Sequence, residues 1–272
     1  MKKSLRYREA LRDARRIVVK IGTRVLAQKS GRPDTRRMAG LARQVAQLQR
    51  DGREVLIVTS GAIGAGMEAL RMKERPTALP DLQMAAAVGQ SRLMARYDKL
   101  FSGLGCIVGQ VLLTHGDFRH KIRLTNARRT LENLLRHKVI PIINENDVVA
   151  DEEIRADLSL GDNDYLAALV VKVVRADLLV LLTTVDGVRE PGPNGSTRRI
   201  RYLEAITPSV FKLVRDSESR LSKGGMASKL SSVLVATKAG CAAVIASGLE
   251  QGILQRVIRG EDVGTIILPE AI

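Results

Sequence analysis

Lysines and bare glycine turns stand at the ends of strand-like segments in this chain. Residues 61–66 (GAIGAG) follow a strand-like run at 54–59, and their three glycines and two alanines leave backbone amides open to an anion. A second bare turn, Gly224-Gly225, precedes a helix start that carries Lys229. Lys20 lies in the first strand-like run, and residues 161–164 form an acidic turn, GDND. This pattern predicts a phosphate-handling site and favours a kinase.

Each of these features also has an ordinary structural explanation. Lys20 could be a strand-end lysine with its ammonium group in solvent, and Lys229 a surface charge on a helix. Asp164 could cap a helix, and the glycines could form simple turns. The functional interpretation therefore depends on the joint occurrence of the motifs.

The elements that position these residues follow the pattern of βα units. Short β-branched runs alternate with longer amphipathic stretches, which predicts a mainly parallel sheet covered on both faces. A helix is expected after Asp34 or Thr35, with an apolar face every third or fourth residue and an end near Gly52. The predicted strands are residues 17–21, 55–59, 107–113, 139–144, 178–183, 243–246 and 265–268.

The predicted sheet has one functional edge. Ligands of open α/β sheets bind beyond the carboxyl ends of the strands. Gly22, Ser60, Asp147 and Thr183 all fall at such ends. Two irregular segments, residues 148–160 and 190–197, also follow strand ends. They are interpreted either as loops that contact the substrate or nucleotide or as surface connections, and we expect the first to move on binding.

Composition bounds the class of protein. The 272 residues are 45% hydrophobic, enough for one α/β domain. There is no apolar run of membrane-spanning length and no hydrophobic signal-peptide region, so a cytoplasmic protein is expected. Cys106 and Cys241 lie in or beside apolar runs and are expected to be reduced core thiols.

The chain carries a formal charge of +15. A polyanionic partner is one explanation, but much of the charge is dispersed. Residues 1–15 are read as a basic N-terminal helix or arm, and the favoured interpretation is a solvated helix at one edge of the domain. With no tryptophan and only three phenylalanines and four tyrosines, the chain is also poor in the aromatic side chains that bind single strands, so nucleic acid binding is not favoured.

Five motifs occur in order along the chain: VVKIGT at 18–23, VTSGAIGAG at 58–66, NEND at 144–147, GDND at 161–164 and GGMASK at 224–229. Together they resemble the glutamate 5-kinases of the amino acid kinase family. The match runs in order from about residue 16 to residue 269, and five spaced motifs are more specific than one glycine loop. The resemblance implies a three-layer αβα sandwich with residues 16–272 as one catalytic domain. It also implies ATP-dependent phosphorylation of the γ-carboxylate of L-glutamate to γ-glutamyl phosphate, which begins proline biosynthesis.

The resemblance assigns residues to roles. Lys20 and Lys229 match the lysines that contact the transferring phosphoryl group, and Asp164 matches the aspartate that orients both. A carboxylate nucleophile is already ionised at neutral pH, so no general base is required. The expected glutamate-binding residues are Ser60, Gly61, Ala62, Asp147 and Asn163, with Asp147 as partner of the α-ammonium group. An N-acylated glutamate could not satisfy that carboxylate, which separates this reading from acetylglutamate kinase.

ATP and Mg²⁺ are the expected cofactors, with the metal ligands left unassigned. Thr184 stands where family members usually carry an aspartate, Arg189 where a tyrosine is common, and Lys223 where a small or hydroxyl residue is common. The nucleotide contacts are therefore the least secure part of the assignment. The expected nucleotide-binding residues are Lys20, Gly22, Thr183, Thr184, Lys223, Gly224, Gly225, Met226, Ala227, Ser228 and Lys229.

The resemblance further implies feedback inhibition by proline and a homo-oligomer, with residues 83–97 as a contact surface. Direct handover of the acyl phosphate to glutamate 5-semialdehyde dehydrogenase is a further expectation. Many relatives append a C-terminal PUA domain, and the chain is expected to be a form without one. Two alternatives remain open. One is another carboxylate, carbamate or phosphate kinase on the same fold, and the other is a non-catalytic regulatory or nucleic-acid-binding relative.

Overall fold

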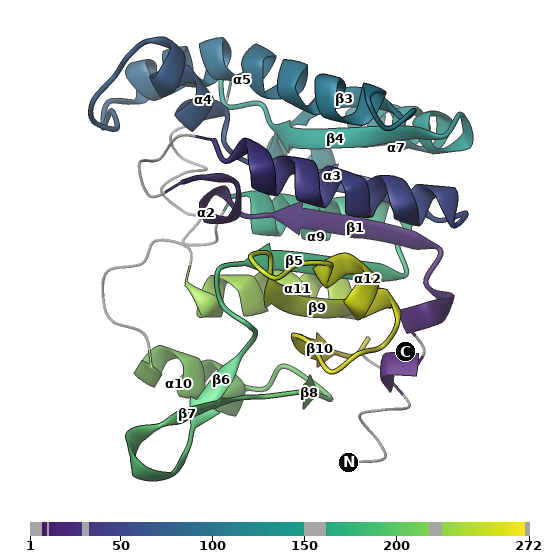
Figure 1. Ribbon diagram of the computed structural model, residues 1–272, viewed down its shortest axis with the longest axis vertical. Helices are drawn as coiled ribbons and strands as arrows, with labels where there is room; N and C mark the ends of the chain where they lie inside the picture. The colour runs from purple at the N-terminus through teal and green to yellow at the C-terminus, as the bar shows by residue number, and fades with distance from the viewer. Residues whose placement is uncertain (1–6, 10, 29–32, 150–161, 218–224, 270–272) are drawn as a thin grey trace.

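An eight-stranded sheet forms the centre of the molecule in the computed structural model, which describes residues 7–9, 11–28, 33–149, 162–217 and 225–269 (Figure 1). All neighbouring strands are parallel except β10 against β9. The seven predicted strands are confirmed to within one residue at each end, whereas β8 was not predicted. In sheet order the strands are β3 (Ile107–Leu113), β4 (Val139–Glu145), β2 (Glu54–Val58), β1 (Arg16–Ile21), β5 (Leu178–Thr183), β9 (Ala242–Ser247), β10 (Thr265–Ile267) and β8 (Tyr202–Leu203).

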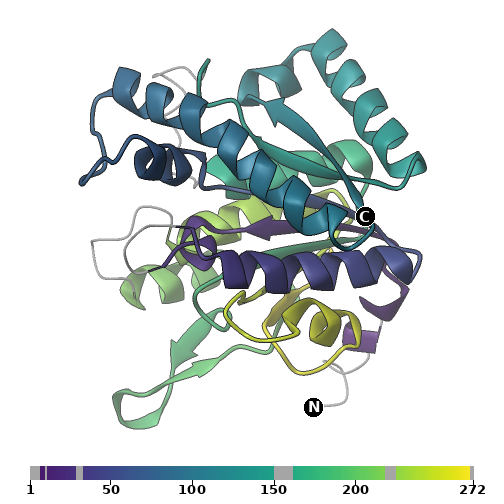
Figure 2. The same cartoon turned by 45° about the horizontal axis from the view of Figure 1, so that its top comes forward.

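Helices cover both faces of this sheet, which confirms the predicted three-layer sandwich. α3 (Thr35–Arg50), α5 (Leu79–Ser102) and α12 (Ile253–Ile258) lie on one face (Figure 2). α7 (Lys121–Arg136), α9 (Asp162–Val174) and α11 (Met226–Lys238) lie on the other. In β1, Ile17, Val19 and Ile21 pack under the first layer, while Val18 packs under the second. Because side chains alternate along a strand, Lys20 faces the layer that contains α9 and α11.

The helix predicted after residue 34 is confirmed as α3. The Asp34 side chain accepts a hydrogen bond from the Arg37 amide at 3.1 Å, which caps the helix start. Gly52 follows the helix with φ +83°, a left-handed conformation that glycine adopts without strain. The four apolar residues on the predicted face, Met38, Leu41, Val45 and Leu48, are all buried.

α4 (Ala62–Ala69) follows β2 and crosses α5 at very close range. A Cβ atom on Gly66 would lie 1.8 Å from the Ala85 carbonyl oxygen, and one on Gly89 would lie 1.7 Å from the Ala62 carbonyl oxygen. The two backbones meet without an intervening side chain at both positions. Gly66 is therefore required for helix packing. It also lies beyond the first turn of α4, where its amide is an intrahelical donor, so the expectation that this amide is open to an anion is wrong.

The breaker-rich segment 190–197 is part of a hairpin rather than an irregular loop. β6 (Arg189–Pro191) pairs with β7 (Thr197–Arg199) around a turn, η2 (Pro193–Gly195), and the hairpin projects from the sheet near α10 (Pro208–Ser217) (Figure 1). Of the other predicted loop, Val148 and Val149 are described and exposed, and residues 150–160 lie outside the described residues.

The prediction that the N-terminal helix is solvated is wrong at Arg8, because this residue is only 2% exposed. Residues 7–9 are helical, η1 (Leu11–Asp13) follows, and Lys2, Lys3 and Arg6 lie outside the described residues. Cys106 and Cys241 are free and buried, as predicted, and burial raises the pKa of both thiols. Within the described ranges, no helix is long and apolar enough to cross a membrane.

Candidate active site

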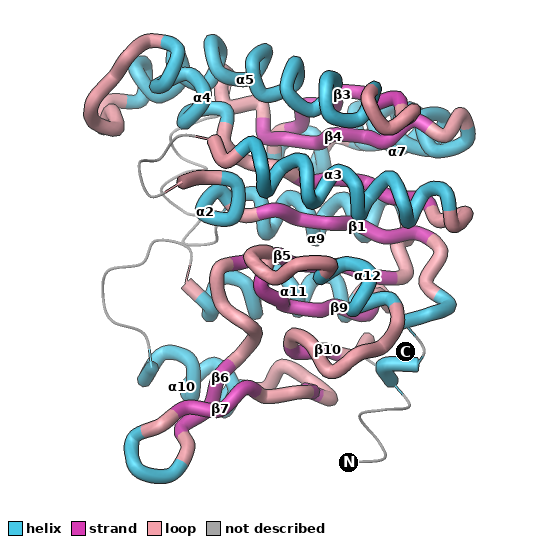
Figure 3. The backbone as a smooth tube through the Cα atoms, viewed as in Figure 1, coloured by secondary structure: helices cyan, strands magenta, loops and turns pink. Residues whose placement is uncertain are grey.

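A pocket of about 500 Å³ opens at the carboxyl ends of β1, β2, β4 and β5. The loops that follow these strands gather at one edge of the sheet, beside α2 (Thr23–Leu26) (Figure 3). The predicted functional edge and the pocket therefore coincide. The sequence-predicted residues that line the pocket are Lys20, Gly22, Ser60, Gly61, Ala62, Asp147, Asn163, Asp164, Thr183, Thr184, Gly225, Met226 and Lys229.

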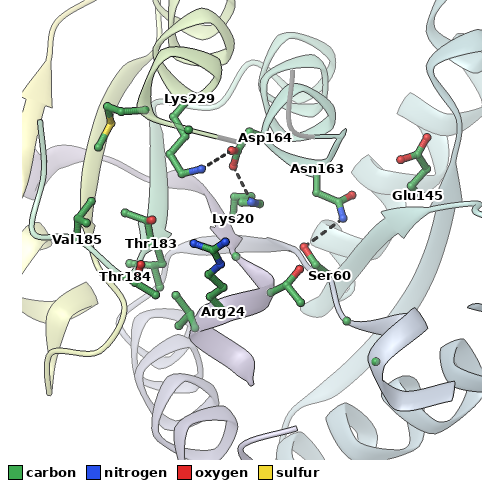
Figure 4. A pocket seen from close by; sticks show the side chains of 18 of the residues that line it. Lys20, Arg24, Ser60, Glu145, Asn163, Asp164, Thr183, Thr184, Val185 and Lys229 are labelled. Atoms are coloured by element: carbon green, nitrogen blue, oxygen red, sulfur yellow. Dashed lines mark hydrogen bonds and ion pairs between the residues drawn. The ribbon is translucent and has the colours of Figure 1, made fainter. Parts of the chain in front are cut away.

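One buried carboxylate holds both predicted lysines. Asp164 is 2% exposed, and its Oδ1 atom lies 2.6 Å from Lys20 Nζ while Oδ2 lies 3.1 Å from Lys229 Nζ (Figure 4). Burial by itself raises the pKa of Asp164, but the two ammonium groups outweigh burial and hold that pKa below its ordinary value. The carboxylate therefore stays ionised, and the trio carries a net charge of +1.

The fold brings the three residues together from distant parts of the chain. Lys20 comes from β1, Asp164 from the first turn of α9 and Lys229 from the first turn of α11. Leu166 and Leu230 are 1% and 0% exposed, so each helix is anchored in the core within two residues of its functional side chain. The N-termini of both helices thus lie at the pocket, where each adds positive potential.

An amide network forms the second part of the pocket. Asn163 Nδ2 donates to Ser60 Oγ and to Asn144 Oδ1, each at 3.2 Å. Asn144 in turn donates to Gln90 Oε1 at 2.8 Å, which fixes its orientation. Asn163 Oδ1 is buried and has no hydrogen-bond partner within the described part of the chain. A buried carbonyl oxygen without a partner is suited to accept a hydrogen bond from a ligand N–H group.

Acidic side chains lie beyond this network. Glu145 is the last residue of β4, Asp147 comes two residues later, and both line the same pocket. Glu145 is 8% exposed. Figure 4 shows Glu145 on the far side of Asn163 from the lysines. The pocket is therefore polarised, with cations at the end of β1 and carboxylates at the end of β4.

The glycine turns contribute in different ways. Gly61 has φ +107° and begins α4, so the turn after β2 requires glycine. The Gly22 amide, in contrast, donates to the Leu182 carbonyl oxygen at 3.1 Å. A Cβ on Gly22 would lie 3.2 Å from that same oxygen. Gly22 thus uses its N–H in the fold and serves the pocket by its small size.

The predicted nucleotide-binding stretch after residue 222 enters the pocket only in part. Gly225, Met226 and Lys229 line it, whereas Ala227 packs against the hydrophobic core and Ser228 is buried in the first turn of α11. Lys223 and Gly224 lie outside the described residues. Thr184 is exposed at the end of β5, next to Thr183.

Sequence analysis missed two arginines that line the pocket, Arg24 and Arg75. Arg24 is the second residue of α2, and Arg75 lies between α4 and α5. The position of Arg24, two residues after a strand-end glycine, was a usable signal because helices that follow such turns face the ligand edge. Arg75 lies in a polar connection with no motif around it.

Comparisons with known proteins agree with this geometry. The profile of the amino acid kinase family matches residues 15–247. A glutamate 5-kinase of Moorella thermoacetica is 47% identical over 264 residues, which cover 96% of this chain and 69% of that protein. A glutamate 5-kinase of Clostridium acetobutylicum is 40% identical over 262 residues, covering 96% of this chain and 97% of that protein.

Two solved structures share the fold. Carbamate kinase from Giardia lamblia, bound to AMP-PNP, has a TM-score of 0.66 at 14% identity and covers 94% of this chain and 99% of its own. UMP kinase from Bacillus anthracis has a TM-score of 0.59 at 17% identity, with coverage of 95% and 97%. At these identities the likeness concerns the fold.

Proposed function

The chain belongs to the amino acid kinase family and, within it, to the glutamate 5-kinases, and we propose that the pocket around Asp164 is its active site. The reaction is ATP-dependent phosphorylation of the γ-carboxylate of L-glutamate, which gives γ-glutamyl phosphate and begins proline biosynthesis. The observation that carries the site assignment is the buried carboxylate that positions two lysines at the ligand edge of the sheet.

The chemistry needs charge stabilisation more than proton transfer. The attacking γ-carboxylate is ionised at neutral pH, so the reaction brings two anions together. In the proposed mechanism, Lys20 and Lys229 contact the transferring phosphoryl group from two sides and stabilise its charge in the transition state. Asp164 keeps both ammonium groups apart and directed into the pocket, so they need no reorganisation during the reaction.

The polarity of the pocket supports the orientation of glutamate. The α-ammonium group of the substrate fits the acidic end, where Asp147 and the buried Asn163 Oδ1 atom can accept hydrogen bonds. The γ-carboxylate then points toward the lysines. An N-acylated substrate has a neutral nitrogen with a single N–H, so it lacks the charge that complements Asp147 and can donate to only one of these acceptors, which selects against it.

ATP would enter as its magnesium complex. Both oxygens of Asp164 are engaged by ammonium groups, and Glu145 and Asp147 lie at the end of the pocket proposed for the substrate ammonium, so the metal ligands stay unassigned among the described residues. Mg²⁺ commonly keeps several waters and is held chiefly by phosphate oxygens. When bound, the ion neutralises charge on the β and γ phosphates.

Three further properties are proposed for the assembled enzyme. Proline, a cyclic analogue of glutamate, should compete at the acidic end of the pocket. The exposed side of α5, where Met84 is 43% exposed, is the proposed oligomer contact, although Tyr97 of the same helix is buried within the subunit. The water-sensitive acyl phosphate favours direct handover to glutamate 5-semialdehyde dehydrogenase in the cytoplasm.

A hydroxamate assay tests the proposed function. With ATP, Mg²⁺ and hydroxylamine, the protein should form hydroxamate from L-glutamate but not from N-acetylglutamate or aspartate. Millimolar proline should lower the rate at low glutamate and lose its effect at high glutamate. A signal with N-acetylglutamate instead of L-glutamate would overturn the substrate orientation at Asp147.

A further inference from the structure

Arg24 lines the active-site pocket but lies outside the Asp164 trio. Its neighbours Val25 and Leu26 are 0% and 4% exposed and fix α2 against the sheet. A Cβ on Gly248 would lie 2.6 Å from Val25 Cγ1, so α2 is already packed against the end of β9 at close range. The backbone of Arg24 is therefore held in place. Figure 4 shows its side chain directed into the pocket, on the side of Lys20 and Thr184.

The charge of Arg24 is not compensated within the described residues. Lys20 and Lys229 share Asp164, and Arg189 pairs with Asp186 at 2.8 Å. Arg24 forms no hydrogen bond or ion pair with any residue in the ranges that the structure describes. The adjacent wall, formed by Thr183, Thr184 and Val185, contributes no charge. Arg24 is exposed to solvent, so a ligand anion that enters the pocket can bind this guanidinium group without displacing a protein partner.

The position in the pocket indicates which anion this is. The substrate α-ammonium belongs at the acidic end near Glu145, which Figure 4 places away from Arg24. The transferring phosphoryl group already has two ammonium groups, held by one carboxylate. A guanidinium group offers a planar fork that binds two phosphate oxygens at once and keeps its charge at all working pH values. Arg24 is suited to the remaining phosphates of the nucleotide.

On the basis of the proposed kinase function, we propose that Arg24 is a nucleotide-binding residue that holds the non-transferred phosphates of ATP. These phosphates remain in the product ADP. The contact can therefore form with both ATP and ADP, and it contributes to nucleotide binding. The residue should set nucleotide affinity, so its loss should raise the KM for ATP.

Binding of adenosine and ADP to the full chain tests this role, with Mg²⁺ present. The variants are Arg24→Gln and Arg24→Lys, with Arg36→Gln as the control, because Arg36 is an exposed arginine of α3 outside the pocket. In Arg24→Gln, the Kd for ADP should rise roughly 10–100-fold, the loss of charge-assisted hydrogen bonds. In the same variant, the Kd for adenosine should change less than about twofold. The Kd for ADP of Arg24→Lys should lie between those of Arg24→Gln and the wild type, and the Kd for ADP of Arg36→Gln should match the wild type.

Three outcomes would overturn the proposal. They are an unchanged Kd for ADP, an equal loss for adenosine and ADP, and a raised KM for glutamate with ADP binding intact. The second would mean that α2 is merely displaced, and the third that Arg24 serves the substrate end. If the wild type forms no γ-glutamyl phosphate but still shows Arg24-dependent ADP binding, this proposal stands and the proposed function alone fails.

Discussion

At the scale of single residues, the two lysines held by Asp164 are expected to dominate the chemical step. Lys20→Ala or Lys229→Ala should lower kcat by a factor on the order of 10² or more, because each removes a positioned charge from the transition state. The measurement is steady-state hydroxamate formation, with circular dichroism to check the fold. Lys238→Ala is a matched control in the same helix as Lys229, since Lys238 is exposed and outside the pocket. Near-normal turnover in either variant would remove that lysine from the mechanism.

Asp164 also links stability to pH. Its folded pKa is depressed, so its ionised form stabilises the fold above the unfolded value of about 3.9, and this stabilisation is lost as pH falls through the folded pKa. Asp164→Asn should therefore cost about 3–5 kcal/mol near neutral pH, because two partly buried ammonium groups lose their counter-ion. The difference in free energy of unfolding between Asp164→Asn and the wild type should shrink below about pH 4.

Urea unfolding at a series of pH values measures this difference, and the variant Asp98→Asn, at an exposed residue, is the control. A difference that stays constant down to pH 2 would contradict the ion-pair account.

Residue types and spacing were enough to predict which side chains meet at the pocket, but not what each backbone group does there. Lys20, Asp164 and Lys229 meet because three motifs sit at strand ends and helix starts, a placement that sequence patterns reveal. The engaged amide of Gly22 was not predictable, because its acceptor on Leu182 is about 160 positions away in the chain. Arg24 follows a strand-end glycine by two residues, but its residue type alone does not separate it from the many other arginines of a basic chain.

At the scale of elements, the crossing of α4 and α5 is expected to tolerate no side chain. Gly66→Ala and Gly89→Ala each place a Cβ under 2 Å from a carbonyl oxygen, so the helices must separate, at a cost of about 3 kcal/mol. Activity should fall as well, because Ala62 at the start of α4 lines the pocket. Gly40→Ala is the control: nothing lies within 4 Å of its Cβ, and replacing glycine inside α3 should stabilise by roughly 0.5–1 kcal/mol. Chemical unfolding compares the three variants, and equal effects at all three positions would argue against the close crossing.

Strand prediction succeeded where burial leaves a long apolar signal and failed where strands are short. The central strands read as continuous apolar runs because helices cover both faces of the sheet. β6 and β7 have three residues each and β8 has two, which is too short for any periodicity, and β6 contains Pro191. Glycine-rich sequence likewise does not distinguish approach to a ligand from approach to another helix. Gly61 and Gly66 belong to one motif, yet only Gly61 faces the pocket.

At the scale of the whole molecule, part of the +15 charge has a structural origin. Five cations line a groove of about 660 Å³ between α7 and α9, namely Arg128, Arg129, Arg136, Lys172 and Arg175. Cations at helix C-termini complement the negative end of the helix dipole. The single carboxylate in the same groove, Glu132, is paired with Arg16 at 2.7 Å. Helix termini thus account for Arg136, Lys172 and Arg175, three of the five cations of this cluster.

Arg8 joins the two ends of the described chain and is expected to stabilise the whole fold without affecting catalysis. Its guanidinium pairs with Asp262 at 3.2 Å and donates to four backbone carbonyl oxygens, those of Arg201, Glu261, Val263 and Gly264. Arg8→Met keeps much of the side-chain volume but leaves these acceptors unsatisfied, which should cost about 3 kcal/mol. Because Arg8 does not line the pocket, kcat and both KM values should stay within about twofold of wild type.

Arg12→Met is the control. It removes only an exposed hydrogen bond to the Arg259 carbonyl oxygen and should lower the free energy of unfolding by less than about 1 kcal/mol. Equal stability of the two variants in urea would mean that the N-terminal segment is not anchored through Arg8.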